Sequence, residues 1–233
     1  MGNNLAILLA GLLLMACAST PQSLTYREQL DIYKDMKIRL YQVGIPIKLA
    51  GVGVCSKTRI DKGVLYHKLR DYPEKLRPVA QSYWGLGADD TILYEGQSGH
   101  VSACQAPLVL DYDTIPNAYT DGDNIFVTSG LLNEIDDLAL SLIIAHELAH
   151  IALKHVDKEP SETLEREADR MALFILARAK LDYRKAALQD VASKPPHIYA
   201  GQKYLDTSKR ADHFRGVIGE IEKLEEEGKA LVP

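Results

Sequence analysis

The chain has 233 residues, of which 46% are hydrophobic and 25% are charged, and its formal net charge is −5 at pH 7. This length and composition suit one globular domain of moderate size with a full hydrophobic core. The negative balance, without any arginine-rich run, argues against nucleic acid as a partner.

Residues 1–16 are predicted to be a signal peptide that precedes the folded domain. Leu5–Ala16 is an apolar run too short to span a bilayer comfortably, but suited to a signal-peptide core. The run leads into L-M-A-C, which resembles a bacterial lipobox, where cleavage precedes the cysteine and the thiol of Cys17 takes a diacylglycerol. By the same resemblance, Ala18 after the cysteine favours the outer membrane. No Lys or Arg precedes the run, so ordinary cleavage to a soluble secreted protein is the alternative.

Residues 17–23 are interpreted as a polar tether, and residues 24–233 as a single domain. Its first element is a helix over Leu24–Val43, where apolar residues recur at helical spacing. Short apolar runs bounded by turn residues then predict three strands, with a helix near Glu74–Tyr83 between the last two. These strands are expected at Lys48–Val54, Gly63–Tyr66 and Thr91–Tyr94.

The chain has three cysteines. If Cys17 carries a lipid, Cys55 and Cys104 remain as a pair, and an oxidising periplasm would join them in a disulfide. Such a bond closes a loop of about fifty residues and contributes roughly 4 kcal/mol on the chain-entropy model. Two buried free thiols are the alternative.

The segment Asn117–Thr128 predicts a β-hairpin, because two extended runs flank the turn residues D-G-D-N. A strand beside a binding cleft can pair its backbone with an extended peptide. A purely structural hairpin is the alternative.

The central motif is His146-Glu147-x-x-His150. Histidines four positions apart on a helix lie about 40° apart around its axis, so both rings can reach one zinc ion. Glu147 can then reach a water on the same metal as general base. The surrounding run Asp137–His155 is apolar nearly all round, which predicts a buried helix capped by Asp136 or Asp137. Two core histidines satisfied by hydrogen bonds are the alternative.

A second helix, capped by Ser161, is predicted to follow antiparallel to the first after a short loop. Helical rise places Glu165 at the level of His150, and Asp169 about one turn deeper, near His146. We therefore expect Glu165 as the third zinc ligand and Asp169 as the acceptor of the second N–H of the His146 ring. Glu167 points elsewhere, about 200° from Glu165. A solvated face paired with arginines is the alternative.

This pair of helices resembles the gluzincin peptidase family that contains HtpX, BepA and the CAAX prenyl protease. The resemblance rests on the His146–His150 motif followed by Glu165-x-x-x-Asp169, and extends loosely over residues 105–233. It implies a zinc core at residues 115–190 and a substrate-facing strand with Asn117 and Ala118. The family also has a His-Pro-Ser/Thr element with a following arginine. Here Tyr204 takes the place of that histidine and Arg210 matches the arginine, so the resemblance implies that these two contact a developing oxyanion.

The predicted fold class is α+β: a mainly helical metallopeptidase domain with a small, largely antiparallel sheet and a last helix from Asp206. The predicted function is hydrolysis of peptide bonds in periplasmic or envelope proteins, with one zinc ion per chain and a membrane link through the lipid on Cys17. A chaperone-like lipoprotein that binds polypeptides with little cleavage is the first alternative. A structural zinc protein is the second, but it needs a fourth ligand, and His155 has the wrong helical angle to supply one.

Overall fold

A computed structural model describes residues 24–55, 59–60, 65–68, 91–94, 101–102, 104, 106–193 and 207–233. Its helices are α1 (Tyr26–Cys55), α3 (Ser129–Glu134), α4 (Asp137–Ala152), α5 (Glu162–Arg178), α6 (Tyr183–Ser193) and α7 (Thr207–Glu226). Its strands are β1 (Arg59–Ile60), β2 (Leu65–Lys68), β3 (Thr91–Tyr94), β4 (Val101–Ser102), β5 (Leu108–Asp111), β6 (Ala118–Thr120) and β7 (Ile125–Thr128).

The sheet nearest the central motif has three strands in the order β5-β7-β6. β6 and β7 form the predicted antiparallel hairpin, whereas β5 runs parallel to β7, so this sheet is mixed. The remaining strands form two antiparallel pairs, β1 with β4 and β2 with β3. Long helices beside small sheets of two or three short strands confirm the predicted α+β class, and Thr91–Tyr94 is a strand as expected.

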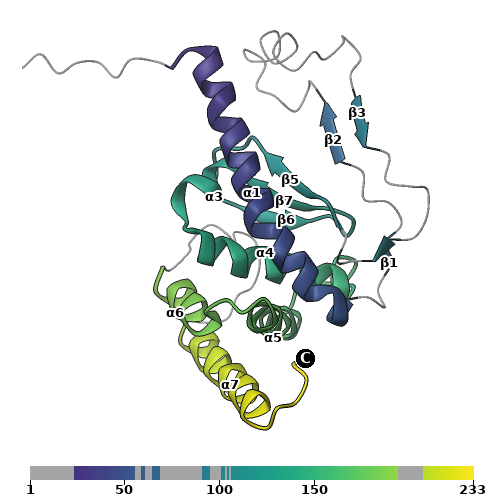
Figure 1. Cartoon of the computed structure of the whole chain (residues 1–233), viewed down its shortest axis with the longest axis vertical. Helices are drawn as coiled ribbons and strands as arrows, with labels where there is room; N and C mark the ends of the chain where they lie inside the picture. The colour runs from purple at the N-terminus through teal and green to yellow at the C-terminus, as the bar shows by residue number, and fades with distance from the viewer. Residues whose placement is uncertain are drawn as a thin grey trace, which may run out of the picture.

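Helix α4 is the centre of the fold (Figure 1). It contacts the sheet through β6 and β7, and it contacts α1, α5 and α6 with its other faces. Because α4 is surrounded in this way, its sequence has to be apolar nearly all round, and eleven of its residues are buried. The predicted cap is confirmed, since Asp136 accepts a hydrogen bond from the Ala139 N–H at 2.8 Å. The helix ends at Ala152, three residues before the expected end.

Helix α1 overturns one prediction, because the expected strand Lys48–Val54 is the last part of this thirty-residue helix. Alternation of apolar and small residues indicated a strand, but burial follows a helical stripe through Leu40, Ile47 and Cys55. Two glycines on the same stripe allow close packing. A Cβ atom at Gly44 would overlap the Leu108 side chain, and one at Gly51 would lie 3.2 Å from Leu148.

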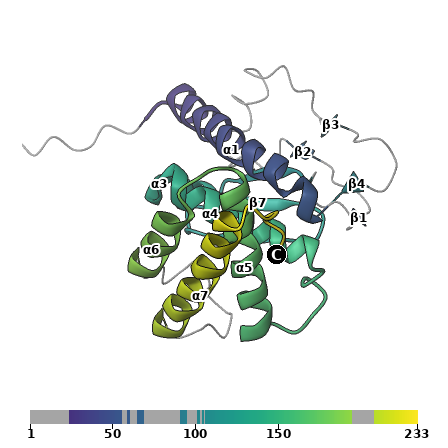
Figure 2. The same ribbon diagram turned by 60° about the horizontal axis from the view of Figure 1, so that its bottom comes forward.

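The predicted disulfide between Cys55 and Cys104 is present, and it joins the end of α1 to the residues just before β5. Arg178 at the end of α5 makes a second long-range link. It donates to the carbonyl oxygens of Ala50 and Leu231, so the chain end returns to α1 and α5. Figure 2 shows α5, α6 and α7 gathered on one side of α4.

Several predictions lie outside the described residues. They concern the signal peptide, Cys17, the helix near 74–83, and Tyr204. Within the described ranges, no helix is both long enough and apolar enough to cross a membrane.

Candidate metal centre

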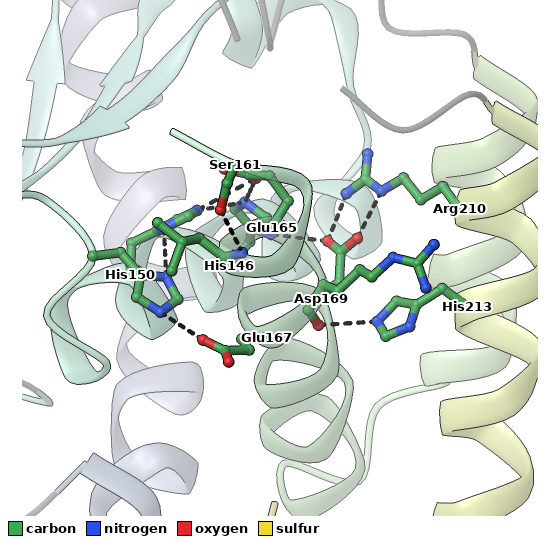
Figure 3. A network of polar contacts seen from close by, with 11 residues as sticks. His146, His150, Ser161, Glu165, Glu167, Asp169, Arg210 and His213 are labelled. Carbon is green, nitrogen blue, oxygen red and sulfur yellow. Dashed lines mark hydrogen bonds and ion pairs between the residues drawn. The ribbon is translucent and has the colours of Figure 1, made fainter. Parts of the chain in front are cut away.

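Helix α4 directs His146 and His150 to the same side, toward α5 (Figure 3). His146 is 4% exposed and Glu147 is 7% exposed, so the motif lies inside the protein. The Nε2 atoms of the two histidines are 2.9 Å apart. Two ring nitrogens at this distance mark a point on which the lone pairs of both rings converge.

Helix α5 brings Glu165 to the same point. Its Oε2 atom is 3.2 Å from His146 Nε2 and 3.5 Å from His150 Nε2. Zinc bonds of about 2.0–2.1 Å in tetrahedral geometry place neighbouring ligand atoms roughly 3.3 Å apart. The three side chains therefore fit one zinc ion, and they are the one group of metal-binding side chains found among the described residues.

The two neighbouring histidine rings keep Glu165 ionised. Burial by itself raises the pKa of this carboxyl, but the rings of His146 and His150 bring it down to about 2. An anionic oxygen beside two imidazoles is a ligand set that suits Zn²⁺.

Asp169 lies behind His146, where the helical rise predicted it. Its Oδ1 atom is 2.9 Å from His146 Nδ1, and the side chain is fully buried. Burial raises the pKa of Asp169, but Arg210 and His146 outweigh this effect and hold it well below its ordinary value. An ionised Asp169 accepts the Nδ1–H of His146 and so leaves Nε2 free to bind a metal.

Arg210, which the family resemblance places at a developing oxyanion, pairs with two buried carboxylates in this structure. Its guanidinium donates to both carboxylate oxygens of Asp169, at 2.9 and 2.7 Å, and forms an ion pair with Asp190 at 3.0 Å. All three of its nitrogens thus face buried carboxylates of α5 and α6. Arg210 supports Asp169 from behind and is not among the residues that line the pocket beside the site, so its expected contact with an oxyanion stays a prediction.

His155 lies against the ring of His150 on the side away from the metal-binding nitrogen, a contact that the sequence did not predict. His155 Nδ1 is 3.1 Å from His150 Nδ1, and His155 Nε2 is 3.2 Å from Glu167 Oε2. Burial, together with the nearby His150, lowers the pKa of His155 and favours its neutral ring. The one sequence feature that could have predicted this contact is the spacing of five residues between His150 and His155 at the end of a helix.

A pocket opens beside the three convergent side chains. Glu147, His150 and Glu165 line this pocket, and so do the residues of β6. Val156, Lys158 and Pro160 of the loop between α4 and α5 line it as well. Burial raises the pKa of Glu147, and a raised pKa suits a carboxylate to proton transfer.

The two residues expected on a substrate-facing strand have different positions. Ala118 lines the pocket. The backbone of Asn117 is hydrogen-bonded to Thr128 instead: its N–H donates to Thr128 Oγ1, and its carbonyl oxygen accepts from the Thr128 N–H. Since antiparallel strands alternate their bonding, the backbone groups of Ala118 point away from β7.

A comparison with protein families matches residues 98–163 to peptidase family M48. The matched segment contains His146, Glu147 and His150, and it ends just before Glu165. Comparisons with curated proteins and with solved structures gave no match. The family match over residues 98–163 confirms the resemblance to the gluzincin metallopeptidases.

Proposed function

We propose that the protein is a zinc-dependent metalloendopeptidase. The observation that carries this proposal is the convergence of His146 Nε2, His150 Nε2 and a carboxylate oxygen of Glu165, all within 4.8 Å of one another. His150 and Glu165 also line a pocket. Glu147 lines the same pocket. The match to family M48, whose peptidases depend on zinc, supports the same proposal.

Each side chain has one role in the proposed reaction. His146, His150 and Glu165 hold one zinc ion per chain, and Asp169 orients His146. When bound, zinc polarises a substrate carbonyl and lowers the pKa of water. Glu147 takes the proton from the attacking water and passes it to the leaving amine. The oxyanion contact remains a prediction for Tyr204 and Arg210.

The proposed substrate is an extended polypeptide. Strand β6 lines the pocket, and Ala118 directs its backbone groups away from β7, where a peptide strand can pair with them. We also propose that the substrates are proteins of a bacterial cell envelope and that a lipid on Cys17 links the protein to the outer membrane. The Cys55–Cys104 disulfide supports an oxidising compartment.

The first test is the zinc content of the purified protein beside its Glu165→Ala and Glu162→Ala variants. Glu162 is on the same helix, half-exposed and paired with Arg166, so it is a matched control. We expect about one zinc per chain in the wild type and in Glu162→Ala, and loss of zinc in Glu165→Ala. A folded wild type without zinc would reject the metal site.

The second test is cleavage of an unfolded protein such as casein. Glu147→Gln should retain zinc and lose cleavage, by a factor of at least about 10² for removal of a general base. Normal cleavage by this variant would reject the role of Glu147. If the zinc-loaded wild type binds casein without cleaving it, the alternative of a polypeptide-binding lipoprotein replaces the protease.

A further inference from the structure

Helix α4 ends in a cap that fixes where His155 lies. The N–H of His155 donates to the carbonyl oxygen of His150 at 2.9 Å, and the N–H of Lys154 donates to that of Ile151 at 3.1 Å. Lys154 has φ 56°, the left-handed conformation of a Schellman motif. In this motif the first and last residues of the cap, here His150 and His155, come together side by side, and an apolar contact usually joins them.

Helix α5 ends in the same cap and shows the usual solution. The N–H of Leu181 donates to the carbonyl oxygen of Leu176 at 3.0 Å, and Lys180 has φ 58°. Both paired positions are leucine there. At the end of α4 the same two positions are histidines, with their Nδ1 atoms 3.1 Å apart. Because the same cap forms with two leucines, the backbone geometry does not explain why both positions at the end of α4 are histidines.

We propose that His155 and Glu167 are positioning residues that hold the ring of His150 for metal binding. This inference rests on the proposed zinc site. His150 Nε2 faces His146 and Glu165, so its proton is on Nδ1, which donates to Nδ1 of His155. His155 then carries its own proton on Nε2 and donates it to Glu167. The result is a directed chain from the carboxylate to the metal ligand.

Burial makes the middle of this chain decisive. The His155 side chain borders the pocket but is only 2% exposed, so water is a poor substitute for it as the acceptor for His150. The Glu167 side chain is 53% exposed, and solvent screens its charge. Loss of His155 should therefore weaken zinc binding more than loss of the Glu167 charge.

The test is the zinc dissociation constant, measured by competition with a chromophoric chelator, for the full chain and four variants. His155→Leu places leucine in the cap, as in α5, and removes the acceptor. His155→Asn keeps an oxygen that can accept from His150. Glu167→Gln removes the distal charge, and Glu162→Gln removes a similar charge from α5 without touching a histidine. The unfolding midpoint of each metal-free variant is measured in parallel.

We expect His155→Leu to weaken zinc binding about 10- to 100-fold while the metal-free unfolding midpoint stays level or rises. His155→Asn should recover much of the loss, Glu167→Gln should lose a few-fold, in line with its exposure, and Glu162→Gln should match the wild type. Zinc binding by His155→Leu at the wild-type level would overturn the inference and leave the proposed function intact.

Two other outcomes are also decisive. If both His155 variants lose zinc equally while they remain folded, the acceptor does not carry the effect, and the inference is overturned. If the wild type binds no zinc, the inference fails together with the proposed function. If His155→Leu does not fold, the comparison of His155→Asn with Glu162→Gln decides: near-equal zinc affinity supports the inference, and a loss in His155→Asn overturns it.

Discussion

The two histidines of the site are supported in different ways on the side away from their convergent nitrogens (Figure 3). Behind His146, Asp169 and Arg210 form a buried ion pair that joins α5 to α7. Behind His150, the support is His155 at the end of α4, followed by the half-exposed Glu167. The first support is part of the tertiary structure, and the second is local. Changes behind His146 should therefore alter the folding stability, and changes behind His150 should alter mainly zinc binding.

The largest effect is expected for Arg210→Met. This change leaves the carboxylates of Asp169 and Asp190 buried without their shared cation, and breaking a buried ion pair costs about 3–5 kcal/mol of unfolding free energy. Denaturant unfolding of the metal-free protein measures it. Arg210→Lys, which keeps the charge, should lose less. A loss below about 1 kcal/mol would mean that the support of His146 is not part of the tertiary structure.

A smaller effect is expected for Asp169→Asn. The amide oxygen can still accept the Nδ1–H of His146, but the negative charge that strengthens this hydrogen bond is lost. Zinc affinity should fall about tenfold, at the low end of the range for residues that orient a metal ligand. A chelator competition titration measures it. Unchanged affinity would show that position 169 serves the fold alone.

The smallest effect is expected for Glu220→Gln. Arg170 and Glu220 join the same two helices as Asp169 and Arg210, but their side chains are 35% and 42% exposed. A surface pair of this kind contributes less than about 1 kcal/mol, and added salt weakens it further. Unfolding at low and high salt checks this. A loss as large as that in Arg210→Met would show that burial is not what distinguishes the two pairs.

The parts of the site that sequence reasoning placed well depend on local geometry. The 3.6-residue helical period fixes the relation of His146 to His150, and it separates Glu165 from Glu167 on α5. A short loop between antiparallel helices then sets the level of Asp169 against His146. Each of these relations involves neighbouring turns, so no knowledge of distant contacts was needed.

The missed parts depend on where elements end and on distant partners. His155 reaches His150 only because α4 stops at Ala152 and Lys154 turns into the left-handed region, where no glycine announces a cap. Arg210 meets Asp169 across 41 residues, a contact that no local pattern encodes. Residues Lys48–Val54 have an alternation that suits a strand, and close packing of Gly51 against Leu148 favours the helix instead.

The disulfide has a consequence for synthesis of the protein. Helix α1 is made before its partners, because its buried residues pack against β5, α4 and α5, which all begin more than fifty residues after α1 ends. Until then Leu40 and Ile47 have no core to join, and exposed apolar surface of this kind favours aggregation of nascent chains. The Cys55–Cys104 bond can close once both cysteines have reached the oxidising compartment, and it does not need α4 to be folded. The bond holds α1 close to the segment that forms β5. Helix α4, which carries the metal-binding motif, can then pack against a core that is already partly assembled.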